Sequence, residues 1–211
     1  MTAGFTQLFD GATLHGWQMS TIRNQPGRDD PGTFVVTDGA LEARPGNDLG
    51  LLWYTEPAPA DFVLRLEWMC TAPDDNSGVF LRFPHPEQQN YDNTAYVGVT
   101  LGLEVQIDEL ARPDGANIHR TAAIYNLAAP GPNLLSVRDP GEWNQYEITI
   151  QANRYTVALN GHEVTRYEFT PGSDARFPKR ALAPTPGDER YVGLQTHTGR
   201  VRFRRIQWKA L

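Results

Sequence analysis

Apolar and polar residues alternate along many short segments of the chain, which is the period expected of β-strands with one buried face. Residues 102–108 show this pattern most clearly. There the apolar residues Leu103, Val105 and Ile107 alternate with the polar residues Glu104, Gln106 and Asp108. The segment is predicted to be a strand whose polar face presents two carboxyl groups and an amide. A strand with one solvent-exposed face would alternate in the same way. The polar face is therefore either a ligand-binding surface or simply exposed to solvent.

The same reasoning predicts around a dozen short strands along the chain. The main further segments are residues 34–37, 40–43, 49–54, 62–70, 79–82, 143–151, 155–159, 162–164, 191–196 and 200–209. Asp38-Gly39 and Asn160-Gly161 each suit a two-residue hairpin turn. Residues 84–101 are predicted to be a long loop, and no amphipathic helix of ten or more residues is expected. The pattern predicts an all-β sandwich or barrel, and 211 residues fit a single domain over residues 1–211.

The composition limits which binding partners and which cellular location are expected. The net charge of −6 argues against a nucleic-acid surface or an anionic membrane surface, because both require a basic patch. Cys70 is the sole cysteine, so no intramolecular disulfide can form, and a buried inert thiol is expected. No segment has the length of a membrane span, and the start has no signal-peptide pattern. A cytoplasmic location is the simplest expectation, although a chain trimmed of an export signal would look the same.

Several motifs together resemble the 3-keto-disaccharide (3-keto-glycoside) hydrolase family. They are Leu8-Phe9-Asp10-Gly11 with Leu14-His15-Gly16-Trp17, Asn76 to Arg82, Gly102 to Asp108, Ala123-Ile124-Tyr125, Trp143 to Ile148, Leu159-Asn160-Gly161, and Gly193-Leu194-Gln195 with His197 and Gly199-Arg200-Val201. The resemblance runs nearly from end to end. It implies a concanavalin-A-like jelly-roll sandwich of two antiparallel sheets, with a glycoside-cleaving site on a concave sheet face. Members of the family usually carry an export signal, which this sequence does not show.

The chemistry implied by the resemblance requires a base, a group that stabilises an enolate and an acid. The ketone of a 3-keto sugar acidifies the proton at C2, so that removal of this proton expels the C1 substituent, and water then adds at C1. Glu104 is the first candidate for the base and Asp108 the second. His197 is the next candidate for proton transfer, because its reference pKa is about 6.5.

Other residues are predicted to bind the sugar. Arg82 would stabilise the enolate or bind a hydroxyl, and Phe80, which shares its strand face, would offer an aromatic platform. The remaining candidates are Gln106, Gln195 and Asn76, as partners of hydroxyl groups, and Tyr125, as an aromatic surface. Glu104 and His197 are also possible ligands of a divalent metal ion, which would stabilise an enolate, although no metal-binding motif is present.

Each assignment has a structural alternative. Glu104 could pair with Arg82 across the sheet, His197 could be a rim residue, and Asp108 with Glu109 could cap the end of a strand. Asp74, Asp75 and Asn76 form an oxygen-rich turn, which would suit calcium or be an ordinary turn.

Two other functions compete with 3-keto-glycoside cleavage. A classical two-carboxylate glycosidase is disfavoured, because Glu104 and Asp108 would lie roughly 13 Å apart along a strand, beyond the separation of about 5–9.5 Å that such pairs use. A non-catalytic carbohydrate-binding module needs aromatic platforms and hydrogen-bonding groups but no base. The sequence leaves open the sugar, the leaving group and the oligomeric state.

Overall fold

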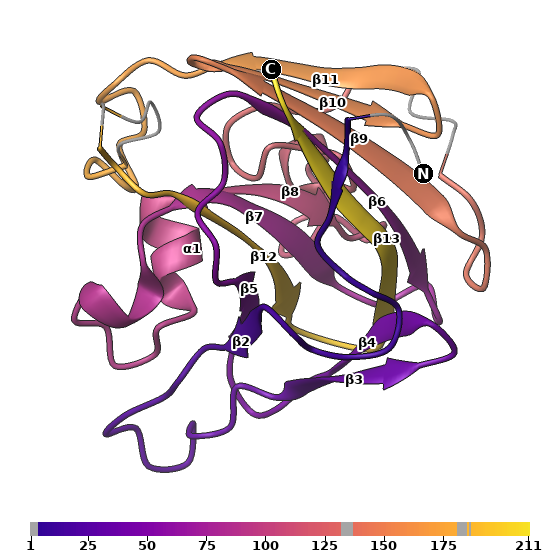
Figure 1. The fold of residues 1–211 in the computed structure, drawn as a ribbon, viewed down its shortest axis with the longest axis vertical. Coiled ribbons are helices and arrows are strands. Elements are labelled where there is room, and N and C mark those ends of the chain that lie inside the picture. The colour runs from indigo at the N-terminus through magenta and orange to yellow at the C-terminus, as the bar shows by residue number, and fades with distance from the viewer. Residues whose placement is uncertain (1–3, 132–136, 181–184, 186) are drawn as a thin grey trace.

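The chain folds into two antiparallel β-sheets packed against each other (Figure 1). The computed structural model describes residues 4–131, 137–180, 185 and 187–211. One sheet has the order β11 (His162–Glu168), β10 (Arg154–Leu159), β9 (Asn144–Gln151), β6 (Phe62–Cys70), β13 (Val201–Ala210), β4 (Ala40–Arg44), β3 (Thr33–Thr37), with β1 (Thr6–Gln7) paired to β13. The other has the order β2 (Trp17–Met19), β5 (Gly50–Tyr54), β12 (Tyr191–Thr196), β7 (Ser77–Phe83), β8 (Leu103–Ile107). The predicted all-β sandwich is confirmed.

The hydrophobic core lies between the two sheets. Leu103, Val105 and Ile107 of β8 are each at most 1% exposed and belong to this core, as the alternation predicts. The polar residues of β8 therefore lie on the outer face of the smaller sheet. The parity of the sequence correctly assigns the two faces of this strand.

Both predicted two-residue hairpin turns are present. Asp38 and Gly39 join β3 to β4, and Asn160 and Gly161 join β10 to β11. All four residues have φ between +50° and +84°, the left-handed conformation that type I′ turns require. Asn, Asp and Gly tolerate this conformation best, which explains why the sequence signal is reliable.

The segment predicted to be a long loop contains a short helix. Within residues 84–101, a 3₁₀ turn spans Pro86–Gln88, and helix α1 spans Tyr96–Leu101. The helix has six residues, too few for a hydrophobic period to stand out. It packs on the outer face of β7, where a Cβ atom on Gly98 would lie 2.9 Å from the Phe80 ring. Phe80 is 0% exposed beneath the helix, so the prediction that it is a platform for sugar is wrong.

Arg82 is displaced from its predicted face by a β-bulge. In the pairing of β7 with β12, Tyr191 is opposite Phe83 and Val192 is opposite Leu81, so Arg82 is the extra residue of the bulge, between two consecutive register pairs. Its φ is +53°, and its side chain is 1% exposed. The guanidinium donates to the carbonyl oxygens of Ala60 and Ala152 and, at 3.3 Å, to the Tyr155 hydroxyl of the larger sheet.

Arg82 is therefore a buried link between the sheets. The prediction that it binds the sugar is wrong, because alternation along a strand reverses at a bulge. The alternative pair with Glu104 is also absent, since the residue opposite Glu104 in the β7–β8 ladder is Phe80.

Cys70 ends β6 and is half-buried. Burial, followed by the carboxylates of Asp75, Glu109 and Asp108, raises the pKa of its thiol to about 12. The thiol is therefore protonated at neutral pH, in agreement with the expected inert cysteine. No helix among the described residues is long and apolar enough to cross a membrane.

Candidate functional site

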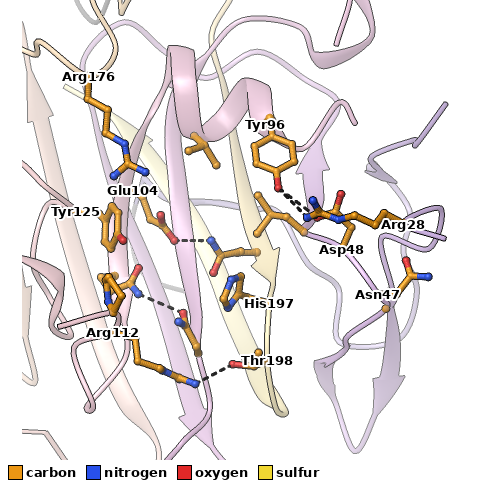
Figure 2. Close-up of a pocket in the computed structure, with 17 residues that line it drawn as sticks. Arg28, Asn47, Asp48, Tyr96, Glu104, Arg112, Tyr125, Arg176, His197 and Thr198 are labelled. Atoms are coloured by element: carbon orange, nitrogen blue, oxygen red, sulfur yellow. Dashed lines mark hydrogen bonds and ion pairs between the residues drawn. The ribbon is translucent and has the colours of Figure 1, made fainter. Parts of the chain in front are cut away.

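A polar pocket of about 590 Å³ opens on the outer face of the smaller sheet (Figure 2). Strands β8 and β12 and helix α1 supply part of its wall, and the segments around residues 28, 46–49, 76, 112–113, 125, 176 and 197–198 supply the rest. Six residues predicted from the sequence line it: Asn76, Glu104, Gln106, Tyr125, Gln195 and His197. The fold thus brings together side chains from four distant parts of the chain.

Glu104 is a buried acid in the wall of this pocket. It is 7% exposed, and its Oε1 accepts a hydrogen bond of 2.8 Å from Gln195 Nε2. Burial raises the pKa of Glu104 to about 8, against the opposing effects of the Arg180 charge and the Gln195 hydrogen bond. Gly78 on the adjacent strand makes room for this carboxyl group, because a Cβ atom there would overlap Glu104 Oε1. A carboxyl group with this pKa is suited to proton transfer near neutral pH.

His197 follows β12 and keeps contact with solvent in the pocket wall. The protein packed around its ring, and then the Arg112 guanidinium, disfavour the imidazolium form and lower the pKa of His197. Figure 2 shows His197 on one side of Glu104, with Tyr125 and Arg176 on the other. The pKa values of Glu104 and His197 are therefore shifted in opposite directions.

Asp108 does not line the pocket. It follows the last residue of β8 and is 0% exposed. Its carboxylate accepts hydrogen bonds from Asn76 Nδ2 at 3.1 Å, Arg112 Nε at 3.0 Å and the Leu110 backbone N–H at 3.0 Å. These donors occupy the acceptor positions of the Asp108 carboxylate. The predicted role as a second base is therefore wrong, and Asp108 caps the end of the strand, as the structural alternative proposed.

The turn before β7 has no free set of oxygen ligands for calcium. Asp75 is 3% exposed, and it accepts hydrogen bonds from the backbone N–H groups of Thr71, Ala72 and Arg200 at 2.6 to 3.0 Å. This is the pattern of an ordinary turn closed by a side chain.

The predicted metal ligands do not form a metal site of the usual kind. No cluster of three or more His, Cys, Asp or Glu side chains in the described part of the chain is placed to hold a metal ion. Glu104 already accepts from Gln195, and the nearby Arg180 cation opposes a second positive charge. The residues present therefore do not fit a bound divalent metal, and no chemical step is assigned to one.

Sequence reasoning missed one wall of the pocket. Arg28 Nη2 forms an ion pair of 2.5 Å with Asp48, and the Tyr96 hydroxyl donates to the same carboxylate at 3.2 Å. Burial raises the pKa of Asp48, but hydrogen bonds from Leu49, Asn93 and Arg28 outweigh it, so the net pKa is lowered. These residues come from loops and a one-and-a-half-turn helix, where no periodic pattern indicates which side chains meet.

Tyr125 and Arg176 form the opposite wall, next to Glu104 (Figure 2). Burial and the Glu104 charge raise the pKa of Tyr125, and the Arg176 guanidinium acts in the opposite direction. The Tyr125 ring also stacks on His119, with 4.9 Å between ring centroids. Arg176 is a further residue that the sequence did not single out, because it lies in a connector rich in proline and alanine.

The sequence of this chain matches the family of 3-keto-alpha-glucoside-1,2-lyase-like domains over residues 4–209. The chain belongs to this family. The resemblance stated from the motifs is thereby confirmed, and the family is one of carbohydrate-active domains. No curated protein sequence matches significantly.

Solved structures share the fold at low sequence identity. A candidate glycosyl hydrolase from Parabacteroides distasonis aligns with a TM-score of 0.75 and 19% identity, over 99% of this chain and 94% of that one. A Bacillus subtilis protein of unknown function with a galectin-like fold gives 0.63 and 11%, over 97% and 94%. The carbohydrate-binding module CBM66 of the same organism gives 0.55 and 10%, over 92% and 96%. These similarities confirm the jelly-roll class.

Proposed function

We propose that this chain cleaves 3-keto-glycosides in the pocket around Glu104. The observation that carries the proposal is a buried carboxyl group with a pKa of about 8, in the wall of a polar pocket. It occurs in a chain of the 3-keto-alpha-glucoside-1,2-lyase-like family. The ketone at C3 acidifies the C2–H bond, and a carboxylate of raised pKa is a correspondingly stronger base for that proton.

C2 of the sugar has two ring neighbours, C1 and C3, and different side chains lie on the two sides of Glu104. Tyr125 and Arg176 lie on one side of Glu104 and His197 lies on the other (Figure 2). We therefore propose a pose with C2 at Glu104, the C3 oxygen toward Arg176 and Tyr125, and C1 toward His197. Negative charge develops on the C3 oxygen as the enolate forms, and the guanidinium and hydroxyl groups stabilise it. Arg176 thus takes the role that the sequence assigned to Arg82.

The reaction needs two steps, and each step has two proton transfers that balance each other. In the elimination, the C2–H and C1–O bonds break, Glu104 takes the C2 proton, and the imidazolium form of His197 protonates the leaving oxygen. In the hydration, water adds at C1, His197 takes a proton from the water, and Glu104 returns a proton to C2. The lowered pKa of His197 makes its imidazolium a stronger acid and leaves the neutral ring ready to accept the proton of water.

Product analysis tests this proposal. Wild-type protein and Glu104→Gln are incubated with 3-keto-trehalose and with unoxidised trehalose, each with and without EDTA. We expect wild-type protein to cleave only the keto form, with or without EDTA, and Glu104→Gln to lose activity by at least about 100-fold. Glu168→Gln, on an exposed strand position outside the pocket, serves as the control and should retain activity.

Three outcomes would contradict parts of the proposal. Wild-type turnover by Glu104→Gln would remove Glu104 from the reaction. Loss of activity in EDTA would show a metal site that the described residues do not explain. Binding of sugars without any cleavage of the keto form would favour the alternative, a non-catalytic carbohydrate-binding module.

A further inference from the structure

A chain of hydrogen bonds with a fixed direction runs beneath the pocket. Asp108 is held as an ion pair by Arg112, whose Nε lies 3.0 Å from Asp108 Oδ2. An ionised carboxylate only accepts hydrogen bonds, so Asn76 must turn its Nδ2 toward Asp108, at 3.1 Å. This places Asn76 Oδ1 on the other side, where it accepts from Gln106 Nε2 at 3.2 Å.

This chain decides which way the Gln106 amide points. Its Nε2 is used by Asn76, so its Oε1 is the atom left over. Gln106 is 3% exposed and lines the pocket, and its Oε1 is buried without a hydrogen-bond partner among the described residues. A buried acceptor without a donor is destabilising, because it has given up its hydrogen bonds to water and gained none in return. A ligand that places a donor at Gln106 Oε1 would remove this cost.

Gln195 Oε1 is also buried without a hydrogen-bond partner among the described residues. The orientation of the Gln195 amide, however, is not fixed in the same way. Its Nε2 donates to Glu104, a group with a pKa of about 8 that gains and loses a proton in the proposed reaction. Once Glu104 is protonated, this hydrogen bond can reverse its direction. Gln106 has no such freedom, because its chain ends on a carboxylate paired with arginine.

We propose that the Asp108–Asn76–Gln106 chain makes the pocket selective for a sugar that donates a free hydroxyl to Gln106 Oε1. The inference rests on the proposed function in so far as the ligand is taken to be a glycoside. A deoxy position or an ether oxygen leaves the acceptor unpaired. A ketone oxygen is rejected there for the same reason, so C3 of a keto sugar points away from Gln106, toward Arg176 and Tyr125.

The test measures binding and so does not depend on turnover. Dissociation constants are determined by NMR titration for methyl α-D-glucopyranoside and its 2-, 3-, 4- and 6-deoxy analogues, with wild-type protein and with Gln106→Met. We expect wild-type protein to bind one of the deoxy analogues at least about 10-fold more weakly than the parent. Gln106→Met should bind that analogue and the parent with nearly equal affinity.

A second variant tests the orienting role of Asn76 without touching the acceptor. In Asn76→Ala the Gln106 amide is free to turn, so discrimination against the same analogue should fall, which a loss of folded protein would not produce. Affinities within two-fold for every analogue, no binding of any of these sugars, or full discrimination in Gln106→Met would each overturn the inference. Cleavage of 3-keto-trehalose together with equal binding of all deoxy sugars would overturn the inference and leave the proposed function standing.

Discussion

Glu104 is held in surroundings that favour its neutral form, and this has a consequence for stability. The pKa of Glu104 in the folded protein is about 8, against 4.5 for an unperturbed glutamate. Well below pH 4.5, Glu104 is protonated in both the folded and the unfolded state, so its ionisation does not change the free energy of unfolding. As the pH rises from 4.5 to 8, only the unfolded chain releases the proton, so the free energy of unfolding decreases progressively and then levels off.

We therefore expect Glu104→Gln to stabilise the protein in alkaline solution. The neutral amide resembles the protonated acid and removes a penalty on the order of 5 kcal/mol above pH 8. Urea denaturation at pH 5 and pH 9 measures the effect, which should be small at pH 5 and large at pH 9. An equal difference at both pH values would show that Glu104 is not the titrating group. Glu168→Gln, which removes an exposed carboxylate, should change stability little at either pH.

The opposite pKa shifts of Glu104 and His197 predict a bell-shaped dependence of kcat/KM on pH. The reactive form carries one proton shared between the two groups, so activity falls below the lowered pKa of His197 and above about 8. In His197→Gln only the ionisation of Glu104 remains. Its reduced activity should rise with pH through about 8 instead of falling, and an unchanged alkaline limb in this variant would exclude His197 from proton transfer.

Gly78 lies directly beside the Glu104 carboxyl group, where a larger residue would not fit. Its Cβ atom, if present, would overlap the Glu104 carboxyl group, so Gly78→Ala should displace this group from its place beside Gln195. We expect kcat/KM to fall by about 10- to 100-fold, since small misplacements of a catalytic group have effects of this size. Gly131→Ala is the control, because the one described atom within 4 Å of its Cβ would be Val164 O, at 3.6 Å. Equal losses in both variants would refute the positional argument.

At the scale of secondary-structure elements, the sequence predicts what depends on local chemistry. The hairpins at Asp38-Gly39 and Asn160-Gly161 follow from turn residues that accept positive φ. The two faces of β8 follow from strict alternation. Arg82 could not be placed, because a bulge reverses the alternation and depends on the register with β12, which no local pattern encodes.

Helix α1 was missed for a related reason, since its position depends on a contact with β7 rather than on its own sequence. Gly98 permits that contact, and a Cβ atom there would lie 2.9 Å from the Phe80 ring. We expect Gly98→Ala to destabilise the fold by about 1–3 kcal/mol, the usual cost of overpacking. Urea denaturation followed by tryptophan fluorescence measures this. An unchanged midpoint would mean that the helix has room to move away from the sheet.

At the scale of the whole molecule, the pocket is assembled from segments that are far apart in the chain. Glu104 and Gln106 were predictable because they share the polar face of one strand. Asp48, Arg112 and Arg176 were not, because loops bring them to the pocket and their neighbours are decided by the path of the entire chain. The family resemblance supplied the fold and the reaction class, but it did not identify these walls.

The protonated state of Cys70 has a practical consequence for studying the protein in solution. A thiol with a pKa of about 12 reacts slowly with maleimides and disulfide reagents at pH 7 to 8. We expect folded wild-type protein to react with Ellman's reagent far more slowly than protein unfolded in guanidinium chloride. Rapid reaction of the folded protein would contradict the raised pKa of the Cys70 thiol. A cysteine introduced at an exposed position such as Ala129 would then accept a fluorophore or spin label selectively, without prior removal of the native thiol.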